Sequence, residues 1–251
     1  MLIIAFDADD TLWVNEPYFR ESEEAFASLF ENYLPLHQTE QELFKTEMDN
    51  LELYGYGVKG FMLSMIETAI RITGGNLSAE GTQRILEIGK ELLDRPIEIL
   101  PHVEQVLSEL SGKYRLVVAT KGDLLDQERK LKKSGLAKYF HHIEIMSDKK
   151  PSDYQKLIQH LDVDPSQFLM IGNSLKSDIL PVLELGGHAV HIPFHTTWAH
   201  EMVSHPVVHP NFREIEASSC LKTLFLRQVL GKPNSFNQCL ATLSSETPAF
   251  R

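Results

Sequence analysis

The chain has 251 residues, of which 43% are hydrophobic and 24% charged, so it is long enough for one large domain or for a core with a smaller second domain. Its formal net charge of -11 argues against nucleic acid or an anionic membrane as a partner. A small phosphorylated substrate stays compatible with this charge, because a bound cation can reverse the local field.

Cysteine usage and the N-terminal segment predict a cytoplasmic protein. Cys220 and Cys239 cannot form a disulfide framework and lack the spacing of metal ligands, so we expect reduced thiols. No basic segment precedes the opening apolar run, and that run is too short to span a bilayer. We therefore expect neither a signal peptide nor a transmembrane helix.

The opening segment predicts a buried strand that ends in acidic residues. Residues 2–6 are uniformly apolar, and Asp7 and Asp9 follow at once. Two carboxylates at the carboxyl end of a strand can act as a nucleophile or metal ligand and as a general acid or base. Asp and Thr are also ordinary turn residues, so the segment 7–11 alone leaves both interpretations open.

The rest of the chain predicts an α/β fold with a doubly wound, Rossmann-like parallel sheet and an inserted helical domain. Apolar residues at helical spacing predict four helices in a row, from about 16, from about Thr39, over 61–72 and over 78–93. Strands then alternate with helices, at 115–119, 142–146, 168–171 and 189–192. We expect a core of residues 1–13 and 99–230, a helical domain of 14–98, and a polar tail of 231–251.

Polar side chains follow four of the predicted strands. They are Asp7 and Asp9 after the first, Thr120 after the second, Lys149 and Lys150 after the third, and Asn173 with Asp178 after the fourth. Each is unremarkable alone, since a lysine pair is usually solvated and a threonine is often a cap. Because the carboxyl ends of parallel strands meet at one edge, the four together indicate a single site.

These motifs resemble those of the haloacid dehalogenase-like hydrolase superfamily, in its Mg²⁺-dependent phosphatase branch, over about residues 1–215. The family's first motif, Asp-x-Asp-x-Thr, matches Asp7-Ala8-Asp9-Asp10-Thr11, and its second matches Thr120. The third, a lysine ahead of a helix, matches Lys149 or Lys150, and the fourth matches residues 172–178. The helical segment 14–98 resembles the family's C1-type α-helical cap.

The resemblance implies a role for each matched residue. Asp7 would be the nucleophile that forms an aspartyl-phosphate, and Asp9 would be the general acid and base. Thr120 and the motif lysine would stabilise the phosphoryl charge. Mg²⁺ would be held by a set of four groups: Asp7, the Asp9 backbone carbonyl, Asn173 and Asp178.

Two positions depart from the family pattern or leave it ambiguous. Asn173 stands where relatives commonly carry an aspartate, and an uncharged ligand should bind Mg²⁺ more weakly. Lys150 is followed by proline, as in the frequent Lys-Pro pair, whereas Lys149 keeps the usual spacing to Tyr154. Both lysines stay candidates, with a slight preference for Lys149.

Weaker signals concern substrate binding. Lys59, in the glycine-rich segment 54–61 that we expect to be a loop, and Lys121, next to Thr120, are candidate substrate contacts. An exposed lysine in a flexible loop is the ordinary alternative. The histidines between His188 and His209 fit no metal-site spacing, so we expect no histidine metal site.

The sequence thus predicts a Mg²⁺-dependent phosphatase for a small phosphorylated metabolite. A phosphotransferase such as a phosphosugar mutase differs only in the group that accepts the phosphoryl, and it stays open. A catalytically silent binding protein of the same fold is the other alternative. Asn173 favours it, whereas the paired carboxylates of Asp7 and Asp9 argue against it.

Overall fold

The core of the structure is a six-stranded parallel sheet with the strand order β3-β2-β1-β4-β5-β6. The computed structural model describes residues 2–215. The strands are β1 (Ile3–Phe6), β2 (Arg115–Lys121), β3 (His142–Met146), β4 (Phe168–Gly172), β5 (His188–His191) and β6 (Phe212–Glu214). The chain winds outward from β1 to β3 on one side and from β4 to β6 on the other, which confirms the doubly wound sheet.

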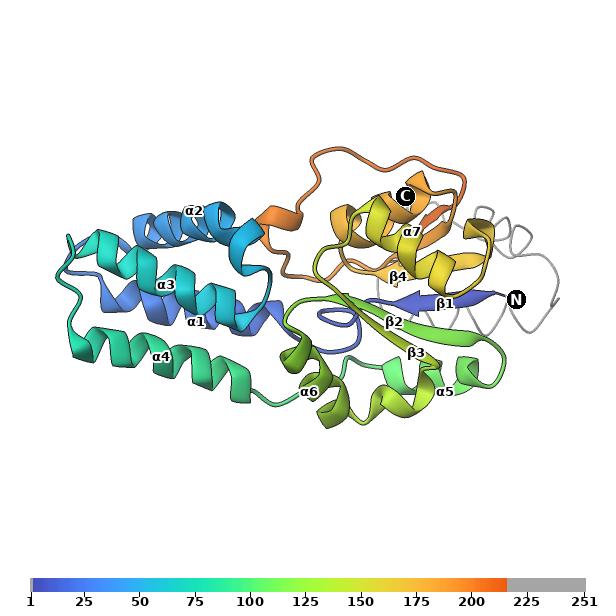
Figure 1. Ribbon diagram of the computed structural model, residues 1–251, viewed down its shortest axis with the longest axis horizontal. Coiled ribbons are helices and arrows are strands. Elements are labelled where there is room, and N and C mark those ends of the chain that lie inside the picture. Colours follow the sequence, from blue (N-terminus) through green and yellow to red (C-terminus); the bar gives the residue numbers. More distant parts are fainter. Residues whose placement is uncertain (1, 216–251) are drawn as a thin grey trace, which may run out of the picture.

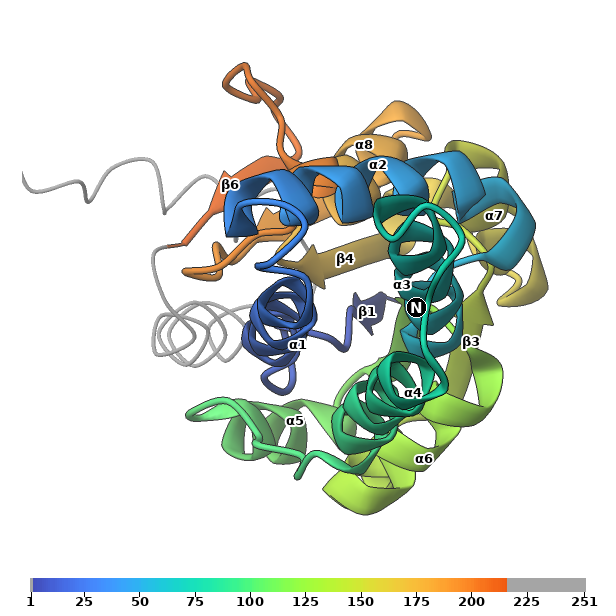
Figure 2. The same cartoon turned by 90° about the vertical axis from the view of Figure 1, so that its left-hand side faces the viewer.

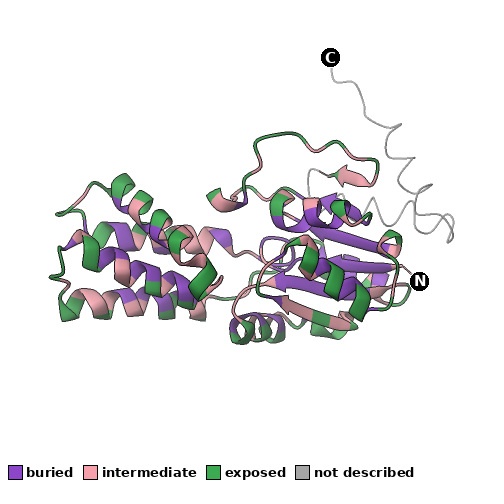
Figure 3. Ribbon diagram, turned by 45° about the horizontal axis from the view of Figure 1, so that its top comes forward, coloured by how far each residue is buried: buried purple, intermediate pink, exposed green. Residues whose placement is uncertain are grey.

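Helices cover both faces of this sheet (Figure 1). They are α5 (Val103–Ser111) and α6 (Leu124–Ser134) on one face, and α7 (Pro151–His160) and α8 (Leu180–Glu184) on the other. Side chains of β1 alternate between the faces, so Ile4 and Phe6 pack with α5 and α6, and Ile3 and Ala5 pack with α7 and α8. The strand reads as an unbroken apolar run because both faces are buried, as Figure 3 shows.

Between β1 and β2 the chain forms a four-helix group with its own apolar centre (Figure 2). Its helices are α1 (Glu16–Leu29), α2 (Leu36–Tyr54), α3 (Val58–Ile72) and α4 (Ala79–Asp94). The centre includes Phe26, Met65 and Ile85, none of which is exposed. At Gly89 helices α3 and α4 approach so closely that a Cβ would lie 1.8 Å from Met62 Sδ. The expected limits of this region, residues 14 and 98, stay a prediction.

The carboxyl ends of the central strands point toward the four-helix group (Figure 1). Phe6 at the end of β1 pairs with Val118 of β2 and with Ile171 of β4. The segments that follow these three strands therefore leave the sheet at one edge, opposite α1, α2 and α3. This topology brings the separated sequence motifs together.

Several element boundaries differ from the sequence-based ones. Helix α2 starts at Leu36, directly after Pro35, rather than near Thr39. The expected loop over residues 54–61 is shorter, because α2 ends at Tyr54 and α3 starts at Val58, which puts Lys59 in the first turn of α3. Helix α5 was not predicted from the sequence, although its buried residues Val103, Val106, Leu107 and Leu110 have helical spacing.

The edge strand β6 was also not predicted, since only three residues form it and none is buried. Short helical turns complete the description, at Leu136–Tyr139, Pro165–Gln167, Leu175–Ile179 and Ala199–Glu201. The expected core residues 216–230, the expected tail 231–251 and both cysteines lie outside the described residues. Within residues 2–215, every helix is too short or too polar to cross a membrane.

Candidate active site

Asp7 lies at the floor of the site, immediately after β1. Its backbone N–H donates to the Ile171 carbonyl at 2.9 Å, which continues the sheet ladder by one residue. Its side chain is buried, with Lys149 Nζ bound to Oδ1 and Thr11 Oγ1 donating to Oδ2 at 3.2 Å. The lysine therefore fixes one carboxylate oxygen and leaves the other directed toward Thr11 and Asn173.

Of the two candidate lysines, Lys149 is the one whose side chain lies in the site. It is 3% exposed, and its Nζ binds both Asp7 and, at 2.6 Å, Asp178 Oδ1. The side chain of Lys150 is 68% exposed and pairs with Asp148 at 3.0 Å. The candidate Lys150 is therefore wrong, because it lies at the surface beside the first turn of α7, while its neighbour reaches inward.

The charges at this floor are strongly coupled. Burial raises the pKa of Asp7 to about 7, with Lys149 opposing the shift and Asp178 adding to it. Burial favours a neutral Lys149, yet the two carboxylates raise the pKa of its ammonium well above the usual value. One lysine thus lies between two carboxylates, and a second cation bound at this floor would favour the ionised form of Asp7.

The oxygen atoms around Asn173 fit a magnesium ion. One terminal atom of its carboxamide lies 3.2 Å from Asp7 Oδ2, from the Asp9 carbonyl oxygen and from Thr11 Oγ1. With nitrogen at that position, the orientation that satisfies the hydrogen bonds, the amide donates to Asp7, Asp9 and Thr11. With oxygen there, the Asn173 oxygen lies 3.2 Å from each of three other oxygens, close to the spacing of about 3 Å between adjacent ligands of octahedral Mg²⁺.

Asp178, the fourth expected ligand, is held differently. Its Oδ1 accepts from Lys149, and its Oδ2 accepts from the Ser174 backbone N–H at 2.9 Å. Gly172 makes room for it, since a Cβ there would lie 2.2 Å from Asp178 Oδ2. Both oxygens thus have protein donors, and a role for Asp178 as a metal ligand stays a prediction.

Asp9, the expected general acid, lies in a cluster of donors. Its Oδ1 accepts from Trp13 Nε1 at 2.8 Å and from Lys130 Nζ at 3.0 Å, and its Oδ2 accepts from Gln127 Nε2 at 2.7 Å. Although burial favours the protonated form, Lys130 and then the other donors lower the pKa of Asp9. Asp9 is therefore held as a carboxylate in this arrangement.

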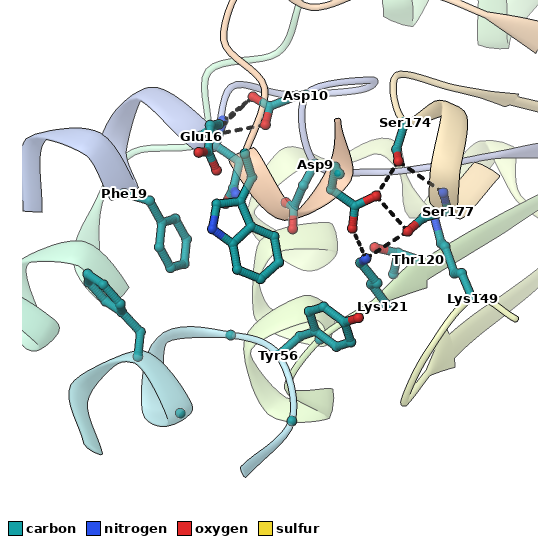
Figure 4. Close-up of a pocket in the computed structure, with 18 of the residues that line it drawn as sticks. Asp9, Asp10, Glu16, Phe19, Tyr56, Thr120, Lys121, Lys149, Ser174 and Ser177 are labelled. Carbon is teal, nitrogen blue, oxygen red and sulfur yellow. Dashed lines mark hydrogen bonds and ion pairs between the residues drawn. The ribbon is translucent and has the colours of Figure 1, made fainter. Parts of the chain in front are cut away.

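Thr120 and Lys121 end β2 in the wall of the site (Figure 4). Thr120 is buried, whereas Lys121 is engaged by other protein groups. Its Nζ donates to Ser177 Oγ at 2.9 Å, pairs with Glu201 and lies 4.1 Å from the centre of the Tyr56 ring. Since Glu201 already neutralises this ammonium, contact between Lys121 and a substrate stays a prediction.

Glu201 connects three segments of the site. Besides Lys121, it binds Ser174 Oγ and, at 2.7 Å, Ser177 Oγ. Burial favours its neutral form, but Lys121 and these hydrogen bonds lower the pKa of Glu201 to about 2. The ionised carboxylate therefore ties the loop after β5 to the end of β2 and to the loop after β4.

These groups line one cavity between the sheet edge and the four-helix group, with about 1170 Å³ of empty space that is partly open to solvent. Asp7, Asp9 and Lys149 line its floor, while Glu47 and Phe61 of the helices line the opposite side. Figure 4 shows Glu16 and Phe19 at one end and Lys149 at the other. The cavity therefore has room for a molecule larger than phosphate.

Lys59 is not among the residues that line this cavity. Its side chain is 56% exposed, and its Nζ pairs with Asp123 Oδ2 at 2.9 Å. Lys59 thus links α3 to the segment before α6 instead of pointing toward a substrate.

Among residues 2–215 no group of three or more His, Cys, Asp or Glu side chains is arranged to hold a metal ion.

Several site residues were not predicted from the sequence. Asp10 has a left-handed backbone, with φ of 60°, and accepts the backbone N–H groups of Asn15 and Glu16 at the start of α1. Gln127 and Lys130 follow the second motif at helical spacing, which could have indicated a shared face. Glu201 gave no such signal, because only tertiary folding brings it to Lys121.

The fold and the edge site define a hydrolase-type α/β protein with paired aspartates after its first strand. The chain belongs to the haloacid dehalogenase-like hydrolase family, whose model matches residues 1–186. A haloacid dehalogenase-like family hydrolase from Xanthomonas campestris is 38% identical, with 89% of each chain covered and a TM-score of 0.79.

More distant structures show the same fold. An HAD phosphatase from Thermococcus onnurineus is 22% identical over 92% of this chain and 98% of its own, with a TM-score of 0.58. A 2-haloacid dehalogenase from Pseudomonas syringae is 19% identical over 90% and 99%, with a TM-score of 0.60. No curated protein matches the chain. The same fold thus occurs in a phosphatase and in a dehalogenase, and the site residues must indicate the reaction.

Proposed function

We propose that this hydrolase is a Mg²⁺-dependent phosphatase that cleaves a small phosphate monoester through an aspartyl-phosphate on Asp7. The observation that carries this proposal is the second carboxylate, Asp9, in the wall of the same cavity as Asp7. A halide is a weak base that leaves without a proton, whereas an alkoxide leaving group needs one. A second acid beside the nucleophile therefore favours ester cleavage over dehalogenation.

Asp7 is suited to attack on phosphorus. Lys149 holds its Oδ1, while its Oδ2 faces Thr11 and Asn173, the side on which the metal ion would be held. Attack forms a bond between one carboxylate oxygen of Asp7 and phosphorus and breaks the bond between phosphorus and the ester oxygen. The buried ammonium of Lys149 and the hydroxyl of Thr120 supply positive charge and a donor to the transferring group.

Asp9 handles the protons of both steps. In the first step it protonates the departing oxygen, which requires a protonated carboxyl freed from Lys130. In the second it accepts a proton from the water that attacks the aspartyl-phosphate, and the carboxylate held by Lys130, Gln127 and Trp13 is already in the form for this step.

Mg²⁺ would be held by Asp7, the Asp9 carbonyl and the Asn173 carboxamide, next to Asp178. When bound, it supplies charge that neutralises the phosphoryl oxygens. His191 supports the segment after β4, since its Nε2 lies 2.9 Å from the backbone carbonyl oxygen of Asn173.

The direct test is a screen of phosphorylated metabolites for release of inorganic phosphate, with Mg²⁺ and with chelator. We expect Mg²⁺-dependent release that Asp7→Asn abolishes, because an amide cannot act as the nucleophile. The variant should stay folded, since the change is isosteric and removes a buried charge. Transfer of phosphate to an added alcohol without release to water would favour a phosphotransferase, and full activity in Asp7→Asn would contradict the mechanism.

A further inference from the structure

The helical side of the cavity is acidic. Glu16 and Glu23 from α1 and Glu47 from α2 all line it. Arg20 pairs with Glu23 at 3.0 Å and with Glu16 at 3.4 Å, but it is not among the lining residues. Glu16 and Glu23 thus share one guanidinium, which does not line the cavity.

One of the three carboxylates has a buried oxygen without a partner: Glu47 Oε2 accepts no hydrogen bond from any described residue. Glu16 is 9% exposed, and its buried Oε1 has the ion pair with Arg20 Nε at 3.4 Å as its contact. Burial raises the pKa of each of these carboxyls to about 8, with the neighbouring acids adding to the shift. A buried acceptor without a donor is costly, so this wall is suited to a ligand that brings donors and positive charge.

The surroundings favour an organic cation over a metal ion. No three acidic side chains among the described residues are arranged to hold a metal ion. Phe19 and Phe61 line the same side of the cavity, with ring centres 5.4 Å apart. Aromatic faces attract alkylammonium groups and stabilise the carbon chain that carries them, whereas a hydrated divalent ion gains little there.

We propose that Glu16, Glu23 and Glu47 form a subsite for a protonated amine, and that the substrates are phosphate monoesters of amino alcohols. The inference rests on the proposed phosphatase function, because it assigns the phosphate to the Asp7 end of the cavity. An ammonium bound at this wall would favour the ionised form of these carboxyls, whereas a phosphate would not, and Lys149 attracts the phosphate at the other end. The two ends together orient such a substrate with its ester oxygen toward Asp9.

The test compares phosphate esters that differ only at the far end of the chain. Each of 2-aminoethyl, 3-aminopropyl and 4-aminobutyl phosphate is paired with its methyl-terminated isostere, n-propyl, n-butyl and n-pentyl phosphate. We expect wild-type kcat/KM to favour the best amine over its isostere by at least about tenfold, as a charge-assisted hydrogen bond would give. Glu47→Gln should reduce this ratio by about tenfold, through KM. Glu52→Gln, at an exposed position of the same helix outside the cavity, should leave the ratio unchanged.

Binding separates this inference from the proposed function. Calorimetry with 3-aminopropylphosphonate and n-butylphosphonate, which lack a cleavable ester, measures the subsite without turnover. If wild type binds the amine phosphonate more tightly and Glu47→Gln weakens this preference, the subsite is supported. Absence of ester hydrolysis in the same protein would overturn only the phosphatase proposal. Equal binding of both phosphonates, or an amine preference that survives Glu47→Gln, overturns the subsite whatever the esters do.

Discussion

Lys130 Nζ lies 3.0 Å from Asp9 Oδ1, so the carboxyl expected to donate a proton is bound to a cation. Lys130 also donates to Asn15 Oδ1 at 2.7 Å, next to the start of α1. The lysine of α6 therefore joins the acid of the sheet edge to the segment that enters the four-helix group. Donation of a proton by Asp9 requires this contact to be broken.

Replacement of Asp9 by Asn should slow turnover by roughly 10² to 10⁴, because the amide cannot protonate the ester oxygen. The loss should be largest for alkyl phosphates and smallest for aryl phosphates, whose leaving groups need little protonation. Steady-state kinetics across a series of leaving groups measures this. An equal loss for every leaving group would remove Asp9 from the role of acid.

The two neighbouring lysines should differ sharply. Lys149→Met removes the ammonium shared by Asp7 and Asp178 and should lower kcat by at least about 10²-fold. Lys150→Met, which removes only a surface pair with Asp148, should change kcat by less than about twofold. Circular dichroism must first establish that Lys149→Met is folded, since it leaves two buried carboxylates unpaired. Similar losses in both variants would mean that the lysines are assigned wrongly.

Asn173→Asp should lower the Mg²⁺ concentration that gives half-maximal activity, because a charged ligand binds this hard cation more strongly than an amide does. Turnover can fall at the same time, since the added charge repels the substrate phosphate. A Mg²⁺ titration of both proteins measures the effect. An unchanged half-saturating concentration would show that Asn173 is not a ligand.

The pair between Lys59 and Asp123 should matter for substrate binding without contact to the substrate. Lys59→Met and Asp123→Asn should each raise KM a few-fold, and the double variant should raise it no further, because both changes break the same link. Asparagine keeps a side-chain oxygen for the Asp126 backbone N–H at the start of α6. Additive effects on KM would mean that the two residues act separately.

The buried carboxyl of Glu47 should make wild-type stability fall as pH rises. Its pKa is raised from 4.5 to about 8, so the folded state binds a proton more tightly than the unfolded state does, and stability is lost between those two values. Glu47→Gln has no carboxyl to ionise at this position. The difference in free energy of unfolding, variant minus wild type, should therefore be larger at pH 9 than at pH 5, by roughly 1 to 3 kcal/mol. Urea denaturation at both values measures this, with Glu52→Gln as control. A pH-independent difference would mean that Glu47 is solvated.

The sequence by itself determined the fold and the floor of the site. The apolar run before Asp7 predicts a buried strand, and alternating strands and helices predict a parallel sheet, because local hydrophobic periodicity carries that information. Parallel topology then requires Asp7, Thr120 and Asn173 to share an edge. Spacing to Tyr154 slightly favours Lys149 over Lys150, and in the structure Lys149 is the buried one of the two.

Only the tertiary structure decided how these groups are paired. The contact between Asp9 and Lys130 joins residues 121 positions apart, and the contact between Lys121 and Glu201 joins residues 80 positions apart. No local pattern encodes such pairs, because they depend on how helices and loops pack over the sheet. Lys59, which pairs with Asp123 at the surface, and Glu47, which lines the cavity, differ for the same reason. A sequence shows that a residue is charged and lies in a helix, but packing determines which way its side chain faces.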